Sequence, residues 1–535
     1  MRKIIVSLLL VTLVASSCRK LDVPVESQYV SGNFPVTAAD FSAVIGPLYT
    51  QLSSKYCIEY FRMQELSTDE AIIPARDGNW DDGGQYRQHH HHTWNKDHSN
   101  VKDVWAWGYG GINTCNRLLS LFDASPNSAA KTTALAEVKT MRAFFYFMMM
   151  DLYGNIPLVQ KFPVTDLPTT AARADVFNFI EAELKSVYPS LPVKVAANAQ
   201  LYYGKPTRGF AQALLAKLYI NAEAYTGKPK YTETVQFCDS VIASNSYSLD
   251  ANFNALFAPE NGPQVTETIF AIPYDALLIP GQQFTRFALV PYLCPKYSVP
   301  TNMSTAMSTT PNFHNIFNLS GDVRNSTWVI GKQFYLDGSP VIFPTKTKSL
   351  DQFYPGANKD TIWQVEILKD LVMLPGKPFD LGNDLRAQCM GIRSTKFYPD
   401  KNIIAATRMG GNDMPVLRLA DVFMMKAEAI LRGAAATTVG SELQTSAVLV
   451  SKIRKRAGAA QVSSITLPEL LDERAREFSW ECWRRNDLIR FGSFEIEYPI
   501  PGDVLTMDKR SHLRIFPIPA TELALNPKLV QNPNY

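Results

Sequence analysis

Apolar residues recur at intervals of three and four in two long stretches of the N-terminal half. In residues 136–152 the stripe comprises Val138, Met141, Phe145, Met148, Met149 and Leu152. Because such side chains share one helix face, the pattern predicts an amphipathic helix, which Gly-Asn-Ile-Pro at 154–157 ends. In residues 209–225 the same period runs through Ala211, Leu214, Leu218, Ala222 and Tyr225. We expect a second helix there, with small residues that let a neighbour approach closely.

The C-terminal part of the chain repeats the helical period. Residues 415–432 and 442–456 are predicted to form a helix pair joined by the soft segment 433–440. The next region, 464–491, opens with Thr466 and Glu469 in the spacing of a capping box. The apolar stripe after the box comprises Leu470, Leu471, Phe478 and Cys482. These units have tetratricopeptide length, although the repeats are too degenerate to identify from periodicity alone.

Between about residues 250 and 396 the helical period disappears. Residues 267–273 and 328–335 have the pattern of short strands, and the stretches between them are rich in Pro, Asn, Ser and Thr. Long irregular segments of this kind usually carry functional surface, although most of their aromatic residues still belong to the core.

The first eighteen residues have the layout of an export signal. A basic start, Met-Arg-Lys, precedes an apolar run over 4–14 and the small residues Ala-Ser-Ser before Cys18. The apolar run is about half of the roughly 20 residues that a membrane-spanning helix needs. We therefore expect this segment to be a signal peptide that is removed after export. Residues 14–18 also resemble the bacterial lipoprotein box, which predicts a signal peptide over 1–17 and lipidation of Cys18. The alternative is an ordinary secretory signal in which Cys18 is incidental.

Composition narrows the function classes. The 53 Lys and Arg residues nearly balance 50 Asp and Glu, and no run of five basic residues occurs, so nucleic acid is an unexpected partner. The six cysteines after Cys18 lie far apart without a C-x-x-C pair, which favours small buried hydrophobic residues over a disulfide framework. No G-x-S-x-G, H-E-x-x-H, P-loop or G-x-G-x-x-G motif is present, so the sequence offers no enzyme signature.

Five blocks in order carry a resemblance to a known family. They are MRAFFYFMMMDLYGNIPLV at 141–159, GKPTRGFAQALLAKLY at 204–219, RLADVFMMKAEA at 418–429, DERAREF at 472–478 with RNDLIRFG at 485–492, and FPIP at 516–519 followed by NP and QNPNY. Each block is only moderately specific, but all five occur in the same order, behind a lipoprotein box, in the SusD/RagB family of outer-membrane nutrient-binding lipoproteins. The chain therefore resembles this family over nearly the whole mature sequence.

The resemblance implies a fold and a function. It implies a mainly α protein, with a tetratricopeptide-like helical repeat scaffold and an irregular, loop-rich ligand-binding subdomain containing short strands. We expect a lipidated tether over 18–32, a helical part over 33–250 with a ligand loop near 76–94, the variable subdomain over 251–396, and a helical part over 397–535. The implied function is a glycan-binding lipoprotein, without enzyme activity or cofactor, that faces the cell exterior and delivers oligosaccharide or polysaccharide to a TonB-dependent SusC-like outer-membrane transporter.

A physical argument places the glycan site within that scheme. Pyranose rings stack their C–H faces on aromatic rings, and their hydroxyls need polar partners. Residues 76–87 combine Trp and Tyr with Asp, Arg, Asn and Gln in a Gly-containing loop, where an aromatic residue is less easily explained as core. The predicted glycan contacts are Trp80, Asp81, Asp82 and Tyr86 there, and Tyr292 and Tyr297 in the irregular middle. Which glycan is bound cannot be read from the sequence.

Two metal patterns compete with this interpretation. Asp77, Asn79, Asp81 and Gly83 nearly imitate a calcium loop, but Asp82 and Gln88 stand where an EF-hand needs Gly and Glu. The loop therefore does not match an EF-hand, and whether it binds a structural calcium ion in another way is left open by the sequence. The run His89 to His92 cannot all ligate one ion, because neighbouring side chains alternate in direction in an extended chain. We predict ordinary side chains there and no metal.

A catalytic alternative rests on acidic residues. The carboxylates are Asp472, Glu473, Glu477 and Glu481, which would have to face one another across a sugar in a glycosidase. They alternate with arginines, so helical ion pairs are the preferred interpretation. The alternative functions are therefore a secreted glycoside hydrolase and a helical-repeat scaffold that binds peptides or proteins.

Overall fold

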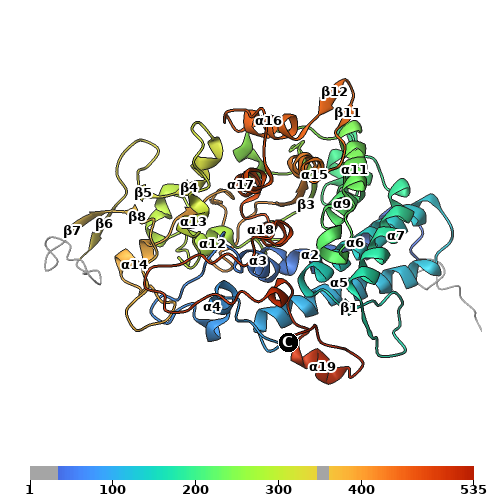
Figure 1. The fold of residues 1–535 in the computed structure, drawn as a ribbon, viewed down its shortest axis with the longest axis horizontal. Coiled ribbons are helices and arrows are strands. Elements are labelled where there is room, and N and C mark those ends of the chain that lie inside the picture. The colour runs from blue at the N-terminus through green and yellow to red at the C-terminus, as the bar shows by residue number, and fades with distance from the viewer. Residues whose placement is uncertain (1–33, 346–360) are drawn as a thin grey trace, which may run out of the picture.

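The computed structural model describes residues 34–345 and 361–535, and the expected signal peptide and Cys18 lie outside this part. Helices dominate the N-terminal half (Figure 1). They are α2 (Ala38–Lys55), α3 (Phe61–Glu65), α4 (Gln85–His90), α5 (Ser99–Asp123), α6 (Ala129–Tyr153), α7 (Arg173–Val187), α8 (Ala199–Tyr202), α9 (Arg208–Ile220), α10 (Ala222–Thr226) and α11 (Tyr231–Ala243). Successive helices pack side by side, α5 on α6, α6 on α7 and α9 on α11. The expected mainly helical scaffold of repeat-like pairs is therefore confirmed.

The two predicted N-terminal helices are present, with boundaries set by local signals. The helix expected over 136–152 is α6, which begins earlier because the Ser128 side chain accepts a hydrogen bond from the Lys131 amide at 3.1 Å. It ends at Gly154, whose φ of 69° few other residues adopt. The helix expected over 209–225 is divided into α9 and α10 at Asn221, whose side-chain amide donates to the Lys217 carbonyl at 2.8 Å.

Part of the predicted C-terminal helix pair is wrong. Residues at its start form strand β10 (Met414–Arg418), antiparallel to β3 (Thr268–Ile272), and helix α15 (Leu419–Leu431) follows. Every residue of both strands is buried, and such a strand has the same apolar run as a buried helix. The expected linker and the start of the second helix instead form a hairpin of β11 (Thr437–Val439) and β12 (Glu442–Gln444). Helix α16 (Ser446–Arg456) follows the hairpin.

The capping-box prediction is confirmed. Thr466 and Glu469 satisfy each other's backbone N–H groups at the start of α17 (Leu467–Phe478). Cys482 is buried as expected but lies beyond this helix, before α18 (Arg484–Arg490). The chain closes with α19 (Ala520–Leu525). No helix in residues 34–345 or 361–535 has the length and apolar character needed to span a bilayer.

The middle of the chain is irregular, as predicted. The expected strand at 267–273 is β3, but the one at 328–335 is reduced to two short pieces. The short elements are α12 (Phe284–Ala288), α13 (Pro311–His314), β4 (Trp328–Val329), β5 (Gly331–Lys332), β6 (Ile342–Thr345), β7 (Thr361–Gln364), β8 (Glu366–Ile367), α14 (Leu385–Cys389) and β9 (Arg393–Ser394). Each strand here pairs antiparallel with one other, β4 with β9, β5 with β8 and β6 with β7.

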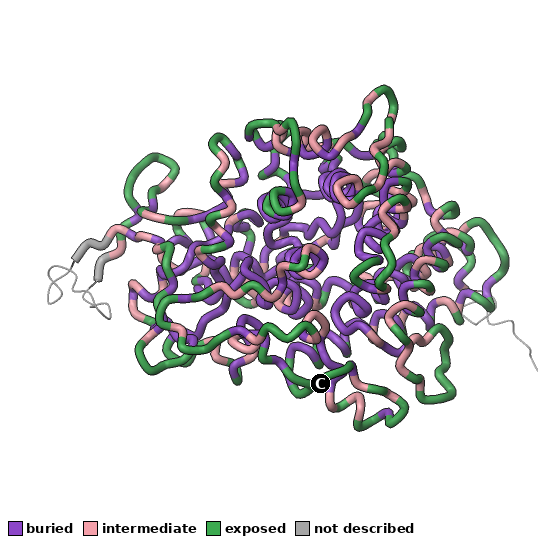
Figure 2. The backbone as a smooth tube through the Cα atoms, viewed as in Figure 1, coloured by how far each residue is buried: buried purple, intermediate pink, exposed green. Residues whose placement is uncertain are grey.

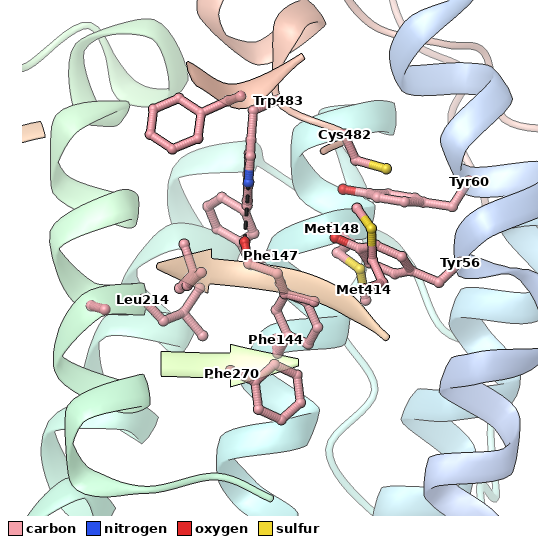
Figure 3. Packing of buried hydrophobic residues seen from close by; sticks show 14 of the residues in the cluster. Tyr56, Tyr60, Phe144, Phe147, Met148, Leu214, Phe270, Met414, Cys482 and Trp483 are labelled. Carbon is pink, nitrogen blue, oxygen red and sulfur yellow. Dashed lines mark hydrogen bonds between the residues drawn. The ribbon is translucent and has the colours of Figure 1, made fainter. Parts of the chain in front are cut away.

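The principal core joins the N-terminal and C-terminal helices, and Figure 2 shows it as a continuous buried interior. Figure 3 shows Phe144 and Leu214 from the first half beside Met414 and Trp483 from the second. The Trp483 indole N–H donates to the Val416 carbonyl at 3.1 Å, so the ring's polar group is satisfied inside the core. The six described cysteines are all buried and form no disulfide among themselves, which confirms their predicted role as small hydrophobic residues.

Candidate functional site

The loop that carries Trp80 borders a surface cavity of about 420 Å³. Its walls come from segments far apart in the sequence. The lining residues are Arg76, Asn79, Trp80, Asp82, Pro291, Met303, Ser304, Thr305, Asn383 and Gln388. One aromatic side chain among many polar ones is the composition expected for a site that stacks on a sugar and hydrogen-bonds its hydroxyls.

The backbone of this loop has an unusual conformation. Asp77, Trp80 and Asp82 have φ values of 51°, 66° and 43°, in the left-handed region that large side chains rarely adopt. Gly83 and Gly84, with φ of 71° and 80°, complete the turn into α4 without this cost. Strained backbone persists only where surrounding contacts hold it, and such sites are often functional.

Two buried side chains hold the loop in place. The carboxylate of Asp380 accepts the backbone N–H groups of Asp77 at 2.8 Å and Gly78 at 3.2 Å. Arg76 is 1% exposed and donates to the carbonyls of Ala387 and Met390. Burial and then the neighbouring Arg393 guanidinium lower the pKa of Arg76 well below its usual value. The loop is therefore fastened to the region around α14 by charge-assisted hydrogen bonds.

Trp80 is half-buried. Its ring packs against Phe287 of α12 with centroids 5.1 Å apart and planes at 59°. Phe287 is itself buried, and the Arg62 guanidinium lies 5.1 Å from its ring centroid. The indole thus rests on the edge of the core and also borders the cavity, which is the position that a stacking platform requires.

The remaining predicted contacts divide between this cavity and other places. Asp82 lines the cavity, and the Tyr292 hydroxyl donates to Gln388 Oε1 at 2.9 Å on its wall. Asp81 instead forms an ion pair with Arg87 at 3.1 Å. Tyr86 is only 3% exposed, and its buried ring has no free face to offer a sugar. Burial raises the pKa of its hydroxyl to about 12, against an opposing effect of Arg62.

Tyr297 borders a different cavity of about 560 Å³. That cavity shares no lining residue with the Trp80 cavity, and its walls include Tyr398 and Lys332. The Tyr297 and Tyr398 rings meet edge to face with centroids 5.6 Å apart. Burial raises the pKa of the Tyr297 hydroxyl. The structure therefore brings Trp80, Asp82 and the Tyr292 hydroxyl together and leaves Tyr297 apart from them.

Sequence reasoning missed several residues of the Trp80 cavity. Ser304 and Thr305 lie in one loop, and Asn383 and Gln388 flank the start of α14. The Gln388 amide donates to the Asn383 side chain at 3.1 Å, which fixes the orientation of both. The only available signal was the richness of 250–396 in short polar residues, which marks a functional surface but singles out no position.

Three of the four carboxylates considered for catalysis, Glu473, Glu477 and Glu481, form ion pairs as predicted, but most of their partners are not on the same helix, and Asp472 is exposed. Arg324 pairs with Glu473 at 2.7 Å and with Glu477 at 3.1 Å, while Arg418 pairs with Glu477 at 2.9 Å and Glu481 at 2.7 Å. Only Arg476 and Glu473 are helical neighbours, and Glu481 lies beyond α17. The side chains of Arg324, Arg418, Glu473 and Glu477 are at most 1% exposed, so no sugar reaches them.

The calcium-like residues also have other partners. Asp77 pairs with Lys377 at 2.9 Å, and Asp81 with Arg87. The histidine run begins in helix α4 and not in an extended segment, which corrects the local structure assumed for it. Its four side chains are all buried.

Comparison with known proteins agrees with this architecture. The model of the SusD family matches residues 368–535, and the model described as "Starch-binding associating with outer membrane" matches 21–254. The starch-binding protein SusD of Bacteroides thetaiotaomicron is 24% identical over 507 residues, covering 89% of this chain and 85% of that protein. A SusD-like protein of Bacteroides ovatus is also 24% identical, and the match covers 88% of this chain and 78% of that protein.

Solved structures have the same fold. Surface glycan-binding protein A from Bacteroides thetaiotaomicron, in complex with laminarihexaose, superposes with a TM-score of 0.71 at 18% identity, covering 92% of this chain and 99% of that one. A SusD superfamily protein from Parabacteroides distasonis superposes with a TM-score of 0.69 at 20% sequence identity, and the match covers 94% of this chain and 100% of that one. The fold and the cavity define a mainly helical scaffold with a loop-lined surface cavity. The chain belongs to the SusD family.

Proposed function

We propose that this protein is a glycan-binding lipoprotein of the outer membrane that captures oligosaccharide or polysaccharide and delivers it to a SusC-like TonB-dependent transporter. The observation that carries the proposal is the half-buried indole of Trp80 on the wall of a polar cavity. The named relatives support it, since one is a starch-binding protein and one was solved with laminarihexaose. The transporter partner rests on the family alone.

The polar groups of the cavity support recognition of hydroxyls. Within the described residues, Ser304 Oγ and Arg76 Nε are buried without a hydrogen-bond partner, and both residues line the cavity. A buried polar atom without a partner costs free energy that a ligand hydroxyl would recover. In this proposal Trp80 provides the stacking face, Asp82 accepts hydroxyls, and the Tyr292 hydroxyl positions Gln388.

The proposal includes anchoring and topology. Lipidation of Cys18 would hold the protein at the membrane, with residues 18–32 as a tether and the cavity facing the cell exterior. In this scheme the variable part, 251–396, supplies most of the cavity wall and the parts over 33–250 and 397–535 supply the scaffold. The protein would bind without cleaving, because Glu473 and Glu477 of α17 are committed to buried ion pairs and cannot act as a catalytic pair.

The test is a binding panel. Isothermal calorimetry of the protein against maltohexaose, laminarihexaose and further oligosaccharides, with an unstructured peptide library as the comparison, should detect affinity for a glycan. An assay of reducing ends in the same mixtures should stay flat. Release of reducing ends would favour a hydrolase, and binding of peptides without glycans would favour a scaffold for protein ligands.

A further inference from the structure

The four consecutive histidines of α4 and its C-terminal end point to two different places. His89 Nε2 contacts Asn100 Oδ1 at 2.9 Å, and His92 Nε2 contacts the Ser67 carbonyl at 2.8 Å. His90 and His91 instead face Asp503, from a loop more than four hundred residues later in the chain. One nitrogen of each histidine and a carboxylate oxygen of Asp503 lie within 4.8 Å of one another.

The hydrogen bonds of His91 leave one of its contacts unexplained. Nδ1 lies 2.8 Å from the Arg87 carbonyl oxygen, and Nε2 lies 2.8 Å from Asp503 Oδ2. Both neighbours are acceptors, and a neutral imidazole carries only one N–H. Either the ring holds two protons, or its second nitrogen and the carboxylate share a cation.

His90, of the same cluster, has a buried nitrogen without a partner in the described part of the chain. Its side chain is buried, and Nδ1 has no hydrogen-bond partner among the described residues. The His90 and His91 rings meet edge to face with centroids 4.9 Å apart, and Phe379 covers both at 5.2 Å. A buried imidazole nitrogen without a partner costs free energy, which a bound ion would recover.

We propose that His90, His91 and Asp503 bind one divalent transition-metal ion of the zinc class. Two imidazole nitrogens and one carboxylate oxygen are the ligand types of a site with three protein ligands, at about 2.0–2.2 Å from the ion. The donors must close from 4.8 Å toward about 3.4 Å, and the contact between His91 and Asp503 must open by several tenths of an ångström.

The surroundings fit a bound ion. The Arg87 carbonyl accepts from His91 Nδ1–H, so it would fix the tautomer that leaves Nε2 free for the metal. Asp503 Oδ1 is held by the Leu505 amide at 3.1 Å, which leaves Oδ2 directed at the histidines. A cavity of about 160 Å³ adjoins all three residues and has room for water as a fourth ligand.

The ion would connect the helix that follows the Trp80 loop to the C-terminal part of the chain. Helix α4 starts directly after the glycines that follow Asp82, and His90 and His91 lie at its other end. Cross-linking that end to Asp503 would hold α4, and so the end of the Trp80 loop, against the C-terminal part of the chain. The site would therefore be structural and would pre-organise the loop.

Zinc binding to the protein tests the proposal. The protein is prepared without a polyhistidine tag, stripped with a chelator and titrated with zinc chloride by calorimetry. We expect one equivalent to bind, and His91→Gln and Asp503→Asn each to weaken that binding by about tenfold or more. The matched control is His512→Gln, whose ring lies against Tyr535 and which does not belong to the cluster, so the affinity should stay unchanged.

A second measurement uses the unaltered protein and so does not depend on the folding of a variant. Cobalt(II) in place of zinc should give the intense visible absorption of a four-coordinate site, and zinc should displace it. The proposal is overturned if unaltered protein binds zinc no better than the double variant His90→Gln/His91→Gln, or if cobalt keeps the weak spectrum of the hydrated ion. In that case His91 is doubly protonated and forms an ion pair with Asp503.

Discussion

Trp80 packs its indole on the buried ring of Phe287 at a centroid distance of 5.1 Å, although it belongs to a polar loop. This contact changes the expected effect of removing it. A tryptophan in a free loop would affect binding only, whereas one that rests on the core edge contributes to both binding and stability.

The first prediction concerns Trp80→Ala. We expect glycan affinity to fall more than tenfold, about 1.4 kcal/mol, because the stacking face is lost. Unfolding free energy should fall by about 1–2 kcal/mol, since the aromatic pair with Phe287 is lost as well. Affinity by calorimetry and a denaturant melt on the same sample check both.

The control for this prediction is Tyr398→Ala. Tyr398 is 45% exposed and lines the other cavity with Tyr297, so its removal should leave glycan affinity intact. Loss of affinity in Tyr398→Ala, with full affinity in Trp80→Ala, would move the binding site to the Tyr297 cavity.

The second prediction tests the packing of the helical core. A methyl group added at Gly111 of α5 would fall on the ring of Phe145, which is fully buried. Gly111→Ala should therefore destabilise the protein by about 1–3 kcal/mol. Within the described residues, Gly46→Ala in α2 meets nothing within 4 Å beyond its chain neighbours and the helix's own backbone, so it should cost much less; the gain from helix propensity is offset because the Pro47 ring disfavours a helical residue with a Cβ before it. Thermal melts that rank the two variants in the opposite order would mean that α5 and α6 pack differently.

The third prediction is a pH dependence. Burial would raise the pKa of Glu477, but the guanidinium groups of Arg456, Arg418 and Arg324 lower it well below its usual 4.5. A carboxyl group whose pKa is depressed by folding stabilises the folded state above its unfolded pKa, and this stabilisation is lost as the pH falls below that value. Glu477→Gln should cost about 3–5 kcal/mol at pH 7 and progressively less below about pH 4.5.

Urea unfolding at a series of pH values measures this difference. The matched control is Glu442→Gln, because Glu442 forms an exposed pair with Lys452 at 2.8 Å and should cost less than about 1 kcal/mol. A Glu477→Gln penalty that stays constant down to pH 3 would show that the charge of Glu477 is not what stabilises the fold.

The fourth prediction concerns anchoring. If the thiol of Cys18 is the acylation site, Cys18→Ser should abolish labelling by radioactive palmitate and release the protein from the membrane fraction. The unaltered protein, fractionated in parallel, is the reference. A labelled, membrane-bound variant would contradict the lipoprotein assignment.

Local signals explain what the sequence could predict. The Thr466 capping box and the Gly154 stop lie within a few residues of the structure that they specify, so α17 and the end of α6 were predictable. Strand β10 was not, because its pairing with β3 buries it completely and removes the alternation that distinguishes a strand.

The candidate site divides in the same way. The composition of the loop identified Trp80, but Ser304 and Gln388 reach the cavity only through the tertiary fold. The approach of Asp503 to His91 likewise joins positions that no local pattern relates. Side chains that meet across hundreds of residues cannot be paired from a single sequence.

The buried ion pairs determine how the molecule can come apart. Arg324 belongs to the loop-rich middle and has no exposed side-chain surface, yet its partners Glu473 and Glu477 lie in α17. Lifting the middle away from the helices would separate Arg324 from both glutamates and break up a buried charge network, at a cost of several kcal/mol. The two parts should therefore unfold together in one calorimetric transition, and the loop-rich middle expressed alone should fail to fold.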